Sequence, residues 1–226
     1  MPRPRQVCTG NGARLLSAVI CTHGDDKGLI MPPEIAPVQA VIVPIILKDK
    51  ADVVLKKARE LKESLKKSGF SVELDEREIT PGTKFFDWEI KGVPVRIEVG
   101  PRDVDNKQVV FVRRDTGEKL FVKENEIESK LKSTFSLIQE NLLANATKKL
   151  KSGFADADSL DKMKSVVNAG KIASVYWCEG EKCHTKIVTL EDGFEGFGSD
   201  LEKHKESKCV VCGKNTATLL FVARSY

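Results

Sequence analysis

The run VQAVIVPIIL, from Val38 to Leu47, constrains the fold of this chain more than any other stretch. Its side chains are almost all apolar, whereas a strand with one face in water would alternate apolar and polar residues. Such a run is typical of a strand buried on both faces, as in a sheet covered by helices. Pro44 within the run predicts a sheet edge or a bulge, because proline cannot donate a ladder hydrogen bond.

The segments that follow favour an α/β layered domain. Apolar residues at helical spacing, alternating residues and turn signals succeed one another along the chain. The expected elements are a helix from Ala51 capped by Asp49 and ended by Gly69, strands at Phe70–Leu74, Val109–Arg113 and Lys119–Lys123, and a long helix at Glu124–Lys151.

The stretch from Thr80 to Asp103 opens with the turn dipeptide Pro81-Gly82 and closes with another, Gly100-Pro101. Two apolar-rich runs lie between these turns. They predict a hairpin with strands at Phe85–Ile90 and Val93–Val99 and a type II′ turn at Gly92-Val93. In that register Glu89 lies opposite Arg96, with Cβ atoms about 5 Å apart.

An opposed Glu89 and Arg96 has two interpretations. The pair is a surface ion pair that contributes about 0–1 kcal/mol to stability, or it recognises an unpaired guanine. In the second case the carboxylate accepts two hydrogen bonds from the Watson–Crick edge, and the arginine donates two to O6 and N7. Phe85 would then supply a stacking face. The residues alone leave both interpretations open.

Residues 1–37 contain glycines and an arginine, Gly10-Asn11-Gly12-Ala13-Arg14, before a short apolar segment. The segment predicts a helix that ends near His23, with Gly24 as its C′ residue. Glycines followed by an arginine at a helix start are compatible with a phosphate site, and equally with a turn and a surface arginine. We expect residues 1–30 to pack poorly unless a partner covers them.

Four cysteines form two close pairs, Cys178-x4-Cys183 and Cys209-x2-Cys212. Four thiolates in two pairs predict a closed tetrahedral zinc site with a structural role, each pair on a turn. The alternatives are four reduced cysteines, two disulfides in an oxidised protein, or a ligand taken from two nearby histidines, His184 and His204.

Size also favours a metal in this tail. Its predicted elements are a helix at Asp158–Asn168, ended by Gly170, and a strand at Ile172–Trp177. About 75 residues with few aromatics bury little apolar surface, so metal binding would supply much of the folding energy. Cys8 and Cys21 stand outside the two pairs, and we expect them to be ordinary reduced cysteines.

Bulk properties exclude some classes of protein. The chain has 226 residues, 41% hydrophobic and 31% charged, which is typical of a soluble globular protein. Its net charge of +4 is compatible with a nucleic-acid partner. No apolar run approaches the roughly 20 residues of a membrane span, and the start, MPRPRQV, has no apolar core of a secretory signal. We expect a cytoplasmic protein.

Several motifs in this chain resemble the archaeal and eukaryotic-like type of prolyl-tRNA synthetase, a class II aminoacyl-tRNA synthetase family. The resemblance covers about residues 10–226. The matching residues are Pro81-Gly82-x-Lys84-Phe85-x-Asp87-Trp88-Glu89, Gly92-Val93-Pro94-x-Arg96, Gly100-Pro101-Arg102-Asp103, His23-Gly24-Asp25-Asp26-x-Gly28-Leu29 and Pro32-Pro33, together with the two cysteine pairs.

The resemblance implies an anticodon-binding domain with a five-stranded mixed sheet, followed by a small α+β zinc domain. Proline anticodons share two guanines, which the family recognises in the matching region. By position, Glu89 and Arg96 would hydrogen-bond guanine, Phe85 would stack, and Arg102 would contact base or backbone. The third class II motif would make Arg14, with Gly10 and Gly12, an ATP contact. The C-terminal Tyr226 would direct its carboxylate toward the active site.

The implied organisation is a remnant of the catalytic domain at 1–37, an anticodon-binding domain at 38–150 and a zinc-binding domain at 151–226. The family ligates proline to tRNA-Pro with ATP and magnesium and is usually a homodimer. Because this chain lacks motifs 1 and 2, we expect it to bind tRNA-Pro, to have no membrane partner and to be inactive alone. The alternatives are a stand-alone tRNA-binding or regulatory module derived from a synthetase, a full enzyme whose upstream portion is encoded separately, and a zinc-stabilised interaction domain with no RNA role.

Overall fold

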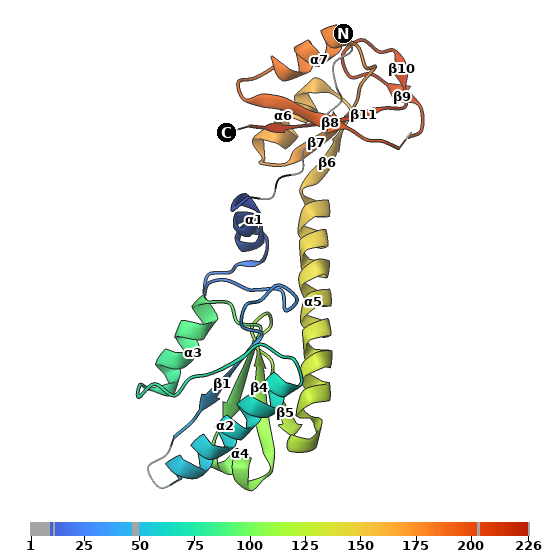
Figure 1. The fold of residues 1–226 in the computed structure, drawn as a ribbon. Helices are drawn as coiled ribbons and strands as arrows, with labels where there is room; N and C mark the ends of the chain where they lie inside the picture. The colour runs from blue at the N-terminus through green and yellow to red at the C-terminus, as the bar shows by residue number, and fades with distance from the viewer. Residues whose placement is uncertain (1–9, 11, 47–49, 203, 226) are drawn as a thin grey trace, which may run out of the picture. The chain divides into compact units, whose positions relative to one another are not determined.

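The computed structural model describes residues 10, 12–46, 50–202 and 204–225 (Figure 1). It divides into two compact units, Met1–Ala146 and Thr147–Tyr226. Asp49, expected as a helix cap, Cys8 and Tyr226 lie outside the described residues. Within the described ranges, no helix combines the length and the apolar character that a membrane span requires. The three-part division expected from the sequence stays a prediction.

The first unit is built on a five-stranded mixed sheet in the order β2-β1-β3-β4-β5, as the resemblance implied. The inner strand β1 pairs in parallel with β2 and β3, while β3–β4 and β4–β5 are antiparallel. The strands are β1 (Ala40–Pro44), β2 (Val72–Leu74), β3 (Val95–Val99), β4 (Gln108–Arg113) and β5 (Lys119–Lys123).

Pro44 is the last residue of the inner strand β1, so the expectation that it marks an edge or a bulge is wrong. Strand β2 ends at Leu74, opposite Ile42, and therefore does not extend alongside Pro44. On that side of Pro44, β2 offers no carbonyl that would require a backbone N–H donor, which proline lacks. The opposite side of Pro44 pairs in register with Val99.

The predicted hairpin is also wrong, because residues Pro81–Ile90 form the helix α3. Thr80 caps this helix by accepting a hydrogen bond of 3.3 Å from the Thr83 N–H. Pro81 fits the first helical position, where its fixed φ suits the helix and its missing N–H is not needed. The closing turn likewise begins a short helix, α4 (Pro101–Asp105), in which Asp103 accepts a hydrogen bond of 2.9 Å from Gly100.

Helices cover the two faces of this sheet unequally. On one face, α2 (Ala51–Lys67) and α5 (Ile127–Ser152) enclose the main core, together with the 3-10 turn η1 (Glu124–Glu126) before α5. On the other face, α3 packs over β1 through a small cluster. Figure 1 shows α3 and α5 on opposite sides of the sheet. The small cluster consists of Val41, Val43 and Val93, with Val38, Phe85 and Trp88 packed against them.

The helix expected near the start is α1 (Arg14–His23), and none of its residues is buried. Gly24 is the C-cap residue of this helix, in an extended conformation with φ of −63°, so the prediction that it is the C′ residue is wrong. The loop that follows runs against α3: the Leu29 N–H donates to the Ile90 carbonyl at 3.1 Å, and the Met31 N–H donates to the Gly92 carbonyl at 3.0 Å.

The second unit holds a four-stranded sheet in the order β6-β7-β11-β8, parallel between β6 and β7 and antiparallel elsewhere. Its core includes Met163 of α6 and Ile187 of α7. The predicted helix and strand are confirmed as α6 and β7. The elements are β6 (Phe154–Ala157), α6 (Leu160–Asn168), β7 (Ile172–Tyr176), α7 (Glu181–Val188), β8 (Phe194–Ser199), β11 (Leu219–Arg224) and a two-stranded ribbon of β9 (Ser207–Lys208) and β10 (Asn215–Thr216).

Candidate nucleic-acid interface and metal centre

Helix α3 and strand β3 bring Phe85, Glu89 and Arg96 together. We call these three residues the α3–β3 cluster. Phe85 and Glu89 lie one turn apart on α3, and Arg96 is the second residue of β3. The Arg96 guanidinium lies 4.0 Å from the centre of the Phe85 ring, and its Nη1 lies 3.5 Å from the Glu89 carboxylate. The contact expected across a hairpin is therefore made between a helix and a strand.

Arg96 has a second carboxylate partner, Glu98, which the sequence analysis did not single out. The Nε of Arg96 donates a hydrogen bond to Glu98 Oε1 at 3.0 Å, and the Glu98 side chain is buried. The signal in the sequence was the spacing of two, because alternate residues of a strand share one face. Two carboxylates and one aromatic ring thus hold the Arg96 guanidinium in place. The Arg96 side chain is 11% exposed.

The hollow under this cluster is too small for a base. It has a volume of about 10 Å³, which corresponds to roughly one water molecule. A nucleobase would therefore have to bind on the outer surface, where the Glu89 side chain is 32% exposed. The lining residues include Val41, Trp88, Val112 and Arg114.

Asp75, at the end of β2, anchors α3 and was not predicted as a functional residue. Its carboxylate accepts hydrogen bonds from the Trp88 indole Nε1 at 2.8 Å and from Arg77 Nη2 at 2.7 Å. Its backbone carbonyl accepts a hydrogen bond of 2.9 Å from the buried Lys84 ammonium. Burial opposes ionisation of Asp75, but the bonds from Arg77 and Trp88 outweigh it and lower the pKa to about 2.

Arg114 braces the other end of α3. Its Nε donates to the backbone carbonyl of Glu89 at 3.0 Å, and its two Nη atoms donate to the Asp25 carboxylate at 2.8 and 2.6 Å. These hydrogen bonds lower the pKa of Asp25 to about 2. Asp25 belongs to the motif quoted for the resemblance, but no local pattern indicates that its partner lies 89 positions away.

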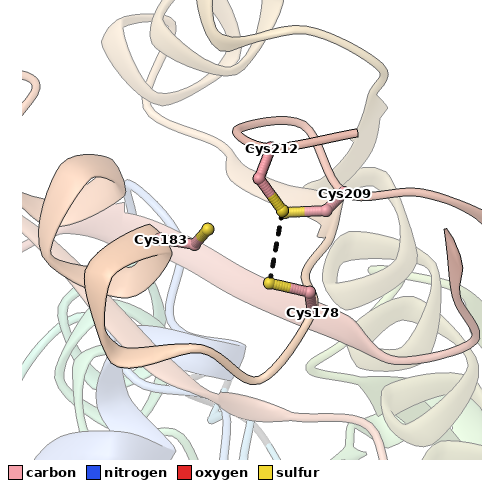
Figure 2. Close-up of side chains that lie close together, drawn as sticks. All are labelled: Cys178, Cys183, Cys209 and Cys212. Carbon is pink, nitrogen blue, oxygen red and sulfur yellow. Dashed lines mark hydrogen bonds between the residues drawn. The ribbon is translucent and has the colours of Figure 1, made fainter. Parts of the chain in front are cut away.

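The four paired cysteines converge in the second unit, with all four Sγ atoms within 4.8 Å of one another (Figure 2). Cys178 lies two residues after the end of β7, and Cys209 and Cys212 lie on the turn between β9 and β10. Cys183 lies in the first turn of α7, so the expectation that both pairs occupy turns is wrong for this residue.

The arrangement of these sulfurs fits a tetrahedral metal ion. Thiolates about 2.3 Å from zinc would lie about 3.8 Å from one another, and Cys178 Sγ and Cys212 Sγ are 3.6 Å apart. That separation far exceeds the length of about 2.05 Å of a disulfide bond. Burial raises the pKa of Cys183 to about 12. Burial also opposes ionisation of Cys209, but nearby N–H groups outweigh it and lower that pKa to about 7.

Neither neighbouring histidine belongs to this group of donors. The His184 ring packs against Trp177, with ring centres 5.9 Å apart. His204 contacts the Asp200 carboxylate at 2.9 Å. The four cysteines are thus the group that could hold a metal ion among the described residues.

Comparisons with known proteins agree with both units. Residues 39–134 match the anticodon binding domain family, and residues 160–226 match the prolyl-tRNA synthetase C-terminal family. The chain carries the anticodon-binding and C-terminal domains of prolyl-tRNA synthetase. It is 42% identical over 225 residues to a proline–tRNA ligase of Methanosarcina mazei, with 98% of this chain and 46% of that protein covered.

Other prolyl-tRNA synthetases show the same extent of similarity. The ligases of Thermococcus kodakarensis and Pyrococcus abyssi are 42% and 43% identical over 226 residues, which cover 98% of this chain and 47% of each relative. The chain therefore spans about half the length of the curated relatives that it matches.

Two further groups of residues carried over from prolyl-tRNA synthetase lie apart from the α3–β3 cluster. Arg102 is exposed on α4, beyond the opposite end of β3 from Arg96. Gly10, Gly12 and Arg14 border a hollow of about 680 Å³ whose described lining comes from residues 10–17 alone. The structure describes no contact of this hollow beyond that segment, and the nucleotide role of these residues stays a prediction.

Proposed function

We propose that this chain binds the anticodon stem-loop of tRNA-Pro and recognises its guanines through Glu89 and Arg96. The observation that carries the proposal is the convergence of Phe85, Glu89 and Arg96 on one surface. These are the residue types that recognise an unpaired guanine, and they come from separate elements that must fold to meet. An isolated surface ion pair would not need the stacked ring or the second carboxylate.

The chemistry of each side chain follows from its contacts. The bond between Arg96 Nη1 and Glu89 is long, at 3.5 Å, so a base can displace it at little cost. The freed Glu89 carboxylate would accept the N–H groups of the Watson–Crick edge, while Arg96 donates to O6 and N7. Glu98 keeps Arg96 oriented through its 3.0 Å bond. Because Arg96 covers one face of the Phe85 ring, a base would stack on the remaining exposed side.

We further propose that Cys178, Cys183, Cys209 and Cys212 hold a structural zinc ion. Four sulfur donors within 4.8 Å of one another leave no open coordination position for a substrate, which favours a structural role over a catalytic one. Bound zinc would favour the thiolate form of its ligands and join β7, α7 and the β9–β10 ribbon.

The similarity to proline–tRNA ligases suggests the wider role. We propose that the chain serves a proline–tRNA ligase that uses proline, ATP and magnesium, is located in the cytoplasm and forms a homodimer. Arg102 would contact the anticodon loop, and Gly10, Gly12 and Arg14 would complete an ATP site with residues beyond those described. The 226-residue protein alone would not catalyse proline-dependent exchange of pyrophosphate into ATP.

The test is binding to a proline anticodon stem-loop, beside a loop with both guanines replaced, at two salt concentrations. We expect the replaced loop to bind at least tenfold more weakly, since each bidentate base contact supplies about 1–3 kcal/mol of discrimination. The variants Glu89→Gln and Arg96→Lys should remove this difference, whereas Arg59→Lys on α2, with a side chain 63% exposed, should leave it intact. Equal, salt-sensitive binding of both loops would disprove recognition of the bases.

A further inference from the structure

The outer strand β5 presents an aromatic side chain between two lysines. Along Lys119–Lys123 the residues alternate: Leu120 and Val122 face the main core, while Lys119, Phe121 and Lys123 are exposed. Phe121 is 71% exposed, more than any other phenylalanine among the large exposed apolar residues described. Single exposed apolar side chains are common on protein surfaces, so a role for Phe121 depends on what surrounds it.

Phe121 shares its sheet face with the α3–β3 cluster. In register, Arg96 pairs with Val112 and Val112 with Lys119, while Glu98 pairs with Val110 and Val110 with Phe121. Two strand spacings and one two-residue step separate Phe121 from Arg96, so their Cα atoms lie about 12 Å apart. This separation lies within the span of one RNA hairpin loop.

An ion pair connects β5, across β4, to the carboxylate partner of Arg96. Lys119 Nζ lies 3.8 Å from Glu98, the same carboxylate that holds Arg96. Lys123 is exposed at the far end of β5. An open sheet face with an aromatic ring and flanking lysines suits single-stranded nucleic acid, because the ring stacks a base and the ammonium groups attract phosphates.

We propose that Phe121 is a second stacking platform, which holds a nucleobase of the anticodon loop outside the guanine pair, with Lys119 and Lys123 at the adjoining phosphates. The proposal rests on the proposed function, because it places the loop on the α3–β3 cluster first. Stacking needs only a flat ring, so this platform accepts any base at the position it holds and adds affinity without sequence discrimination.

The experiment uses the 226-residue protein and stem-loops that carry the fluorescent base 2-aminopurine at one loop position at a time, outside the two guanines. Stacking on Phe121 should change the fluorescence at one position. Phe121→Leu keeps apolar bulk but removes the ring, so it should abolish that change and weaken binding about tenfold. The matched control is Phe197→Leu, since Phe197 is 61% exposed in the second unit; this variant should bind like the unchanged protein.

The outcomes separate this proposal from the proposed function. If Phe121→Leu binds the loop as tightly as the unchanged protein while guanine replacement still weakens binding, the second platform does not exist, and a protein partner becomes the better candidate for this face. If guanine replacement has no effect on the unchanged protein, recognition through Glu89 and Arg96 fails instead. The double variant Lys119→Gln/Lys123→Gln removes two proposed phosphate contacts. It should therefore reduce the slope of log affinity against log salt concentration by about 2.

Discussion

The indole Nε1 of Trp88 donates a hydrogen bond of 2.8 Å to the carboxylate of Asp75, whose side chain is 1% exposed. Lys84, one turn earlier on α3, donates to the backbone carbonyl of the same aspartate. The next residue after each anchored side chain belongs to the α3–β3 cluster: Phe85 follows Lys84, and Glu89 follows Trp88. A buried acceptor beneath the helix therefore sets the orientation of the surface that faces Arg96.

The first prediction concerns the pH dependence of Asp75. Its pKa is about 2 in the fold, below the ordinary 3.8, so the folded protein binds this proton less tightly than the unfolded chain. The carboxylate therefore stabilises the fold above about pH 4, by about 2 kcal/mol, and this contribution is lost as the pH falls toward 2. Asp75→Asn should lower the free energy of unfolding by about that amount at pH 7 and by much less near pH 2.

Urea unfolding of the first unit, followed through Trp88 fluorescence in a Trp177→Phe background, measures this difference. The control Asp105→Asn removes an aspartate whose side chain is 60% exposed and paired with Lys50, and it should cost less than about 1 kcal/mol at every pH. A cost for Asp75→Asn that does not change between pH 7 and pH 2 would show that the charge is not what matters.

The second prediction compares two glycines with almost the same backbone. Gly92 has φ of +71° and Gly117 has φ of +72°. A Cβ at Gly92 would lie 2.4 Å from the Leu29 carbonyl oxygen, whereas a Cβ at Gly117 would meet nothing within 4 Å. Gly117→Ala should cost only the backbone penalty of about 1 kcal/mol, and Gly92→Ala should cost about 3 kcal/mol or more.

Thermal unfolding of the two variants gives the comparison directly. Because Gly92 adjoins the end of α3, Gly92→Ala should also weaken binding of the cognate stem-loop, while Gly117→Ala should not. Equal stability of the two variants would mean that the loop 24–31 does not pack closely against α3.

The third prediction concerns the metal centre. The purified protein should carry about one zinc per chain, and a strong chelator should lower the unfolding temperature of the second unit, because the four sulfurs come from separate elements that zinc would join. Cys212→Ser should lose most of the zinc, while Cys21→Ser, outside the cluster, should retain it. Metal analysis by mass spectrometry, with calorimetry, measures both effects. Full zinc content in Cys212→Ser would rule out the four-cysteine site.

The hairpin predicted for 80–103 shows where a local pattern misleads. Phe85–Ile90 is a short apolar-rich run, and runs of this length do not distinguish a strand from a helix by periodicity. Pro81 after Thr80 is a signal for the start of a helix, and it indicates α3. The interpretation of Pro81-Gly82 as a turn overlooked this signal. Longer segments with several turns of regular spacing, such as Ala51–Lys67, were predicted as they are observed.

The cysteine cluster shows the opposite case, because the spacing of the four cysteines in the sequence already predicted that they converge. Two close pairs of sulfur residues can converge in few ways, and the structure brings all four within 4.8 Å. The residue types of Glu89 and Arg96 alone left two interpretations open, a surface ion pair and a guanine site. The resemblance to a known family was needed to favour the guanine site. Arg102 and Arg14 remain predictions from that resemblance.

The sequence by itself determined the layered α/β class, the long helices, the strands of the first sheet and the two cysteine pairs, because each depends on spacings within a short segment. Tertiary structure alone decided which partners Asp75, Arg96 and Arg114 take. Arg114 joins the Asp25 carboxylate to the last turn of α3, and Asp75 fixes that helix from beneath. Such contacts join residues far apart along the chain, and their energy depends on burial and geometry that no local pattern specifies.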